Sequence, residues 1–205
     1  MKITKEQRQE KIDSIVDNAI EVFMLKGYQE SSFIDIAKKM GIARSTIYLY
    51  FKDKNELLKA CLRRKFLKNK ELFFKIDFQK TQDQSEKLQN LIDKIQFFYL
   101  HEDQRKFYSM IASLAINDHE IANIWYEESL CFLKQLWTNV CTSLNLPTKL
   151  QEFYFTMFFS VFFSSCFSNE CFKENKLTLD FCTFMQTLKE VVLNQELSLK
   201  DKENE

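Results

Sequence analysis

The chain has 205 residues, of which 45% are hydrophobic and 28% charged, and this balance excludes an intrinsically disordered protein. Only two Gly and one Pro occur in the whole sequence. Because sheet-rich folds use both residue types in their tight turns, the sequence predicts an all-α fold built from long helices. Residues 1–65 hold 14 basic and 9 acidic side chains, a net charge of +5, whereas the remainder is acidic. A basic N-terminal part suggests contact with a polyanion.

Two helices are predicted in the first 40 residues. Apolar residues recur at helical spacing from Ile12 to Phe23, and Gly27 stands where this helix would end. Ser32 with Asp35 three residues later is a start signal for a short second helix over residues 33–39. We therefore expect a long helix followed by a short one.

The next segment, residues 46–51 (Thr-Ile-Tyr-Leu-Tyr-Phe), favours a strand by local propensity alone. A turn before it and a capping pair after it, Asp53 with Glu56, instead leave room for two helical turns between helices. A small residue, a glycine and a branched apolar residue stand at the offsets of a helix-turn-helix: Ala37, Gly41 and Ile47. The pattern predicts a recognition helix at about residues 43–51 that leads into a long connecting helix.

The outer face of this recognition helix carries side chains suited to DNA. Arg44 can contact the O6 and N7 atoms of a guanine together, and Ser45 can reach a base edge or a phosphate. The predicted DNA-binding residues are Ser31, Ser32, Arg44, Ser45, Thr46, Tyr48, Tyr50 and Lys54. The alternative is that the tyrosines are boundary residues of an ordinary helical bundle, which leaves the Arg-Ser-Thr trio and the glycine turn unexplained.

The segment SSFIDIAKKMGIARSTIYLYFKDKNELL resembles the DNA-binding domain of TetR-family transcriptional regulators, and the resemblance covers residues of about 8–68. It implies base contacts by Arg44 and Ser45, a base or phosphate contact by Tyr48, and phosphate contacts by Thr46, Tyr50 and Lys54. It also implies a homodimeric repressor released from a palindromic operator by a ligand. It also implies a DNA-binding domain at residues 1–68 and a helical effector-binding and dimerisation domain at 69–205. Ala43 departs from the family, which often has Ser or Thr there, and the lost cap should cost about 1 kcal/mol.

Beyond residue 69, helices are predicted at about residues 86–100, 104–115, 120–144, 147–169 and 178–195. Aromatic residues of the middle helices suggest a pocket for a small hydrophobic or aromatic effector: Phe97, Phe98, Phe107, Tyr108, Met110, Trp125 and Tyr126. The later helices are apolar on more than one face, which favours a partner subunit. The predicted dimer residues are Phe155, Phe158, Phe159, Phe162, Phe163, Phe181, Phe184 and Leu188.

Other classes of protein have little support in the sequence. With two His, no C-x-x-C pair, no Gly-rich phosphate loop and no nucleophile paired with a base, we expect no enzyme, no metal and no cofactor. The six Cys fit small core residues, with a redox switch at Cys166 and Cys171 as an alternative. Residues 153–169 form an uncharged stretch of 17 residues interrupted by Ser and Thr, so a membrane-associated helical protein is a further alternative. The charged N-terminus does not resemble a signal peptide, and a cytoplasmic location without membrane contact is expected.

Overall fold

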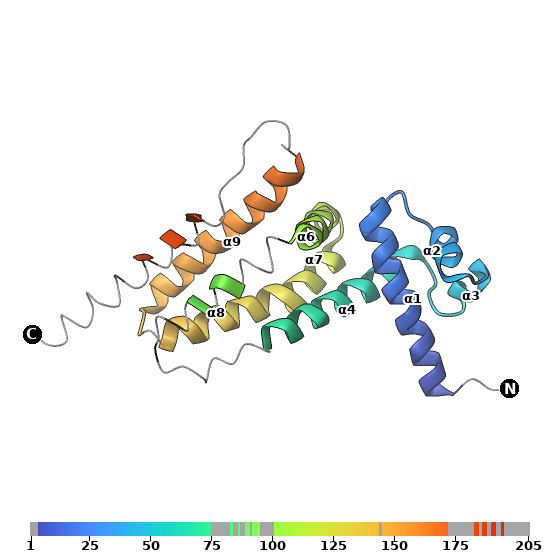
Figure 1. The fold of residues 1–205 in the computed structure, drawn as a ribbon, viewed down its shortest axis with the longest axis horizontal. Helices are drawn as coiled ribbons and strands as arrows, with labels where there is room; N and C mark the ends of the chain where they lie inside the picture. Colours follow the sequence, from blue (N-terminus) through green and yellow to red (C-terminus); the bar gives the residue numbers. More distant parts are fainter. Residues whose placement is uncertain are drawn as a thin grey trace, which may run out of the picture. The chain divides into compact units, whose positions relative to one another are not determined.

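A computed structural model of the chain describes residues 4–74, 101–143 and 145–171, together with isolated positions between 83 and 94 and between 183 and 194. The regular elements of these residues are helices, as Figure 1 shows, which confirms the predicted all-α fold. In chain order they are α1 (Lys5–Lys26), α2 (Phe33–Met40), α3 (Arg44–Tyr48), α4 (Lys54–Phe74), α6 (Glu102–Ala115), α7 (His119–Trp125), a π-helical turn (Tyr126–Leu130), α8 (Cys131–Ser143) and α9 (Thr148–Cys171).

Local capping fixes the ends of the first two helices. Thr4 and Gln7 form a reciprocal capping box at the start of α1, and Gly27 ends that helix at a φ of 82°. Ser32 and Asp35 form the same box at the start of α2, as their spacing predicted. Gly41 ends α2 at a φ of 64°, in the left-handed region that glycine adopts without strain.

The recognition helix is shorter than the sequence predicted. Regular helix covers Arg44–Tyr48, after which the N–H groups of Tyr50 and Phe51 both donate to the Ile47 carbonyl and close a tight turn. Ala43 occupies the cap position and offers no side-chain hydrogen bond, as expected from its methyl group. The helix is therefore held by packing rather than by capping.

Helix α7 begins at an aspartate cap that was not among the predicted helix starts. Asp118 accepts hydrogen bonds from the backbone N–H groups of Glu120 and Ile121 and so starts α7. The predicted helix at 120–144 is nearly continuous, but it contains the π-helical turn between α7 and α8. The predicted helices at 86–100 and 178–195 lie mostly outside the described residues. Within the described part of the chain, no helix is long and apolar enough to cross a membrane.

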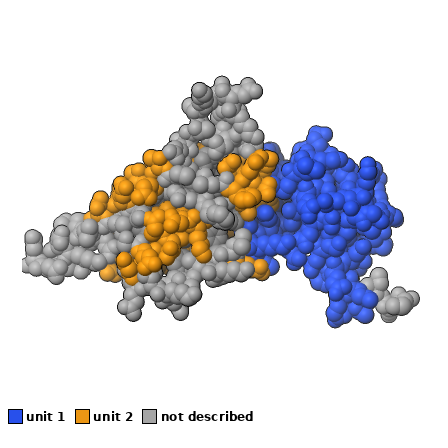
Figure 2. Space-filling view, viewed as in Figure 1, with its two compact units in different colours: residues 1–69, 110–128 blue, residues 70–109, 129–205 orange. Residues whose placement is uncertain are grey.

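Two compact units make up the chain, and Figure 2 colours them separately. The first contains residues 1–69 and 110–128, and the second contains residues 70–109 and 129–205. Inside the first unit, the segment 110–128 is tied to α4 by a salt bridge of 2.5 Å between Lys59 and Glu120. A hydrogen bond of 3.4 Å from the Asn55 amide to Asp118 adds to it. The end of α6 and all of α7 thus pack as part of the helix-turn-helix unit.

Inside the second unit, α8 packs on α9. The Trp137 ring stacks on Phe158 with centroids 6.3 Å apart, and its indole N–H donates to the Gln151 carbonyl at 3.0 Å. The Gln151 amide in turn donates to the Leu146 carbonyl at 2.6 Å. A buried polar side chain on α9 is therefore satisfied by the loop that precedes it.

Candidate nucleic-acid interface

The recognition helix α3 is anchored through its inner face. Ile47 is 0% exposed and Phe51 is buried beside it, while Ala37 on α2 is small enough to let the two helices approach closely. The opposite face of α3 carries Arg44 and Ser45, both exposed to solvent. A helix buried on one side and polar on the other can be presented to a DNA groove without loss of its own core.

Arg44 is held in place by its neighbour one helical turn later. Its guanidinium donates to the Tyr48 hydroxyl at 2.7 Å and lies 5.2 Å from the centre of the Tyr48 ring. Tyr48 in turn packs edge-on against Phe33 of α2, with centroids 4.9 Å apart. The chain from Phe33 through Tyr48 to Arg44 orders the arginine before any ligand binds, which lowers the entropy cost of a base contact.

Tyr50 is paired with Arg8, which was not among the predicted DNA-binding residues. The Arg8 guanidinium of α1 lies 5.0 Å from the centre of the Tyr50 ring, a cation–π geometry. Arg8 is exposed, so its charge is added to the surface that carries Tyr50. The two residues are 42 positions apart, and only the charge of the basic N-terminal part hinted at this contribution.

Lys54 has a structural role that the sequence did not predict. Its ammonium donates to the backbone carbonyls of Tyr28 at 2.8 Å, of Gln29 at 3.2 Å and of Ser31 at 2.9 Å. It also lies 4.4 Å from the centre of the Tyr28 ring. The three N–H bonds of the ammonium are thus directed at the turn between α1 and α2, and a phosphate contact by Lys54 remains only a prediction.

The two predicted serines differ in what they present to solvent. Ser31 is only 4% exposed, and its hydroxyl donates to the Tyr28 carbonyl at 2.8 Å. This placement disagrees with the predicted DNA contact, because the side chain faces the protein interior rather than a ligand. The Ser32 hydroxyl is half-buried and is used in the α2 capping box, where it donates to the Asp35 carboxylate at 2.6 Å.

The capping carboxylate of α2 is also a tie to α1. Lys26, at the end of α1, forms a salt bridge with Asp35. The hydrogen bond from Lys26, followed by that from Ser32, lowers the pKa of the Asp35 carboxyl to about 2. Asp35 therefore stays ionised at neutral pH and holds the start of α2 against the end of α1.

The part of the chain that contains this interface has known relatives. Residues 15–61 match the family model described as "Bacterial regulatory proteins, tetR family". Over 59 residues the chain is 42% identical to the fatty acid metabolism regulator protein of Bacillus subtilis, an alignment that covers 29% of this chain. The helix-turn-helix segment of this chain belongs to the TetR family. This is a family of regulatory proteins rather than of enzymes. Alignments with the first curated relatives cover only 25% to 30% of their lengths.

Solved structures extend the likeness beyond this segment to the fold of most of the chain. A TetR-family protein of Mesorhizobium loti superposes with a TM-score of 0.73 over 94% of this chain and 98% of its own, at 17% identity. FadR of Bacillus subtilis, solved in complex with stearoyl-CoA, gives a TM-score of 0.62 over 88% of this chain and 96% of its own, at 22% identity. At such identities the likeness shows a common fold and nothing about ligands.

The predicted effector residues are divided between the two units. Phe107 and Tyr108 belong to the second unit and are buried, whereas Met110, Trp125 and Tyr126 belong to the first. Trp125 is buried and Met110 is half-buried, whereas Tyr126 is 58% exposed. Phe97 and Phe98 lie outside the described residues, and the effector pocket remains a prediction.

The predicted dimer residues also differ in exposure. Phe158 is 2% exposed inside the chain, which leaves little of it for a partner, while Phe155, Phe159 and Phe184 are half-buried. The side chains of Phe162, Phe163, Phe181 and Leu188 lie outside the described ones.

The cysteines give the redox alternative no new support. Burial raises the pKa of the Cys61 thiol and raises that of Cys141 to about 12, which makes both poor thiolates. The side chains of Cys166 and Cys171 are not among the described ones.

Proposed function

We propose that the protein is a homodimeric transcriptional repressor that binds a palindromic DNA operator in the cytoplasm and is released by a small hydrophobic or aromatic effector. Residues 1–68 bind DNA, and residues 69–205 bind the effector and form the dimer. The observation that carries the proposal is the ordered, exposed Arg44 on a helix whose opposite side is fully buried at Ile47.

The DNA contacts divide into those that read bases and those that hold the backbone. Arg44 contacts a guanine in the major groove, a bidentate pair that contributes about 1–3 kcal/mol of discrimination. Ser45, beside it, contacts a base edge or a phosphate. The Thr46, Tyr48 and Tyr50 hydroxyls and the Arg8 guanidinium bind phosphates, which adds affinity without sequence preference.

Support for a dimer comes from the outer face of α9. Its buried stripe contains Gln151, Tyr154 and Phe158, whereas Phe153 is 56% exposed and Met157, four residues later, is 37% exposed. Residues four apart lie on one face of a helix, so α9 presents apolar side chains away from its own core. A second copy of the chain covers this face in the proposed dimer.

The effector acts by favouring the form of the dimer that does not fit its operator. To move a 1:99 distribution to 99:1, it must bind that form about 10⁴-fold more tightly. The buried Phe107 and Tyr108 favour a hydrophobic ligand. Because a relative of the DNA-binding domain is named for fatty acid metabolism, and FadR was solved with stearoyl-CoA, acyl compounds are the first class to test.

Selection of bound duplexes from a random library, followed by gel shift, tests the proposal. We expect an enriched palindrome, and we expect Arg44→Ala to weaken binding to it by roughly 5- to 150-fold, equivalent to about 1–3 kcal/mol, and to relax one base position. Arg63→Ala, which removes an exposed arginine from α4, is the matched control and should leave the preference intact. A selection that enriches no palindrome would refute the palindromic operator. Equal losses of DNA affinity in the two variants would refute the role of Arg44 in base reading.

A further inference from the structure

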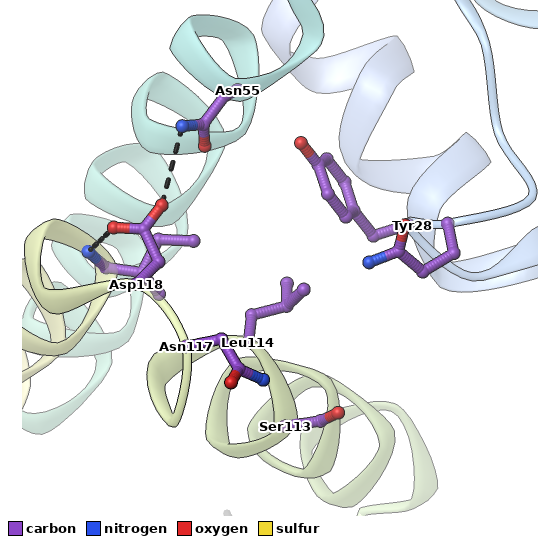
Figure 3. A pocket seen from close by; sticks show the side chains of 8 residues that line it. Tyr28, Asn55, Ser113, Leu114, Asn117 and Asp118 are labelled. Carbon is purple, nitrogen blue, oxygen red and sulfur yellow. Dashed lines mark hydrogen bonds between the residues drawn. The ribbon is translucent and has the colours of Figure 1, made fainter.

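A surface cavity of about 400 Å³ is lined entirely by residues of the first unit. Figure 3 shows Tyr28 of the α1–α2 turn and Asn55 of α4 facing Ser113, Leu114 and Asn117 across it. Gln29, Asp118 and Ile121 complete its lining. The volume is at the lower end of the range of small-molecule sites.

Asp118 is the charged side chain among the lining residues, and neutral donors of the protein hold it. Asp118 accepts from two backbone N–H groups and from the Asn55 amide, and its pKa is lowered mainly by the bond from Ile121. Lys59 binds Glu120, and Lys54 is held by three carbonyls. The lining residues thus offer no cation to an anionic ligand.

Apart from the Asn55 amide, which donates to Asp118, the neutral polar side chains of the lining are bonded to no other described residue, and Gln29, Ser113 and Asn117 are exposed to solvent. Among the described residues, the Tyr28 hydroxyl, the Gln29 and Asn117 amides and the Ser113 hydroxyl have no hydrogen-bond partner. Burial, together with Asp53 and Asp118, raises the pKa of the Tyr28 hydroxyl, so it stays protonated and can donate. The amides offer both donors and acceptors, and Leu114 and Ile121 give the cavity an apolar part.

We propose that this cavity binds a small, neutral, polyhydroxylated ligand of about the size of a monosaccharide or cyclitol. Hydroxyl groups donate and accept at once, as do the unpaired amides and hydroxyls that face them. The C–H face of such a ring packs against the Leu114 and Ile121 side chains. A fully apolar ligand would displace water from the polar groups of the wall without replacing its hydrogen bonds, and an anionic one would lose its hydration beside the Asp118 carboxylate.

The same ligand would alter DNA binding, a consequence that rests on the proposed function. Tyr28 lines the cavity, and the Lys54 ammonium contacts both the carbonyl and the ring of Tyr28. Gln29 lines it as well, and its carbonyl is the second acceptor of Lys54. A ligand that orders Tyr28 and Gln29 therefore acts on the turn from which α2 and α3 are presented.

Isothermal titration calorimetry of the full chain tests the site, with glucose, galactose, mannose and myo-inositol as neutral probes and glucosamine and glucuronate as charged ones. We expect saturable binding of at least one neutral probe. The double variant Ser113→Ala, Asn117→Ala should weaken it at least fivefold, because both side chains line the cavity and have no partner in the described protein. Asn123→Ala, an exposed asparagine outside the cavity, should leave it unchanged.

Three results would overturn the site: no saturable binding of any neutral probe, binding of the charged probes alone, or equal binding by the double variant. Gel shift with the selected operator then measures the consequence for DNA. We expect the saturating probe to change operator affinity at least threefold in the natural chain and not in the double variant. An unchanged affinity would refute the regulatory consequence. Calorimetry needs no operator, so the site can fail or stand independently of the proposed repressor.

Discussion

Replacement of Lys54 by methionine removes the ammonium and keeps most of the aliphatic side chain. The carbonyls of Tyr28, Gln29 and Ser31 then lose their donor, and the Tyr28 ring loses its cation. A hydrogen bond that involves a charged group contributes about 1.5–3 kcal/mol. Because the site is half-buried and water replaces part of what is lost, we expect Lys54→Met to lower the free energy of unfolding by about 2–3 kcal/mol in total.

Urea unfolding followed by circular dichroism measures this loss, and gel shift on the selected operator measures DNA affinity in parallel. Lys52→Met is the matched control, since Lys52 is an exposed lysine two residues earlier on the same turn. It should change the free energy of unfolding by less than about 0.5 kcal/mol. If Lys54→Met has the same free energy of unfolding as the control, while its affinity falls equally for every DNA sequence, the ammonium contacts phosphates and the structural role is wrong.

Three further predictions concern the helix-turn-helix. Tyr48→Phe keeps the ring but removes the acceptor of Arg44, and should weaken operator binding by about 2- to 10-fold in gel shift; unchanged affinity would contradict the ordering of the arginine. The new methyl group of Gly41→Ala meets no atom within 4 Å, but the alanine must adopt a φ of 64°, so thermal melting should show a free energy of unfolding lower by about 1–2 kcal/mol. A loss above about 4 kcal/mol would contradict a cost that comes from the backbone alone. Asp35 has a lowered pKa of about 2, so its stabilisation is present above about pH 4 and is lost between pH 4 and 2. The free energy of unfolding of Asp35→Asn should therefore change less with pH in that range than that of the natural chain. Identical curves for the two proteins would contradict the pairing of Asp35 with Lys26.

Local sequence signals predicted the parts of the fold that local chemistry controls. The helix start at Ser32 and Asp35 and the turn at Gly41 were predicted, because caps and turns depend on residues within a few positions of each other. The end of α3 was not predicted correctly, since the turn after Tyr48 is closed by two N–H groups that share the Ile47 carbonyl. Hydrophobic periodicity cannot detect such a bond.

The sequence indicated which residues of α3 share its outer face, but not the contacts that reach this face from other segments. Arg44 and Tyr48 lie four residues apart on one helix, so the sequence could place them on a common face. Arg8 was missed because it reaches Tyr50 from α1, and no local pattern encodes that contact. Ser31 shows the reverse error: a serine beside a helix start suits a phosphate, but the packing of the turn buries it.

The sequence by itself determined the all-helical class, the helix-turn-helix and its polar outer face, because caps, glycines and apolar spacing act over a few residues. The tertiary structure decided where Lys54 directs its ammonium, and it placed residues 110–128 with the N-terminal unit. It also formed the polar cavity between the α1–α2 turn, α4 and the end of α6. These features depend on residues more than 20 positions apart, whose meeting is set by the packing of whole helices and not by the preference of any one segment.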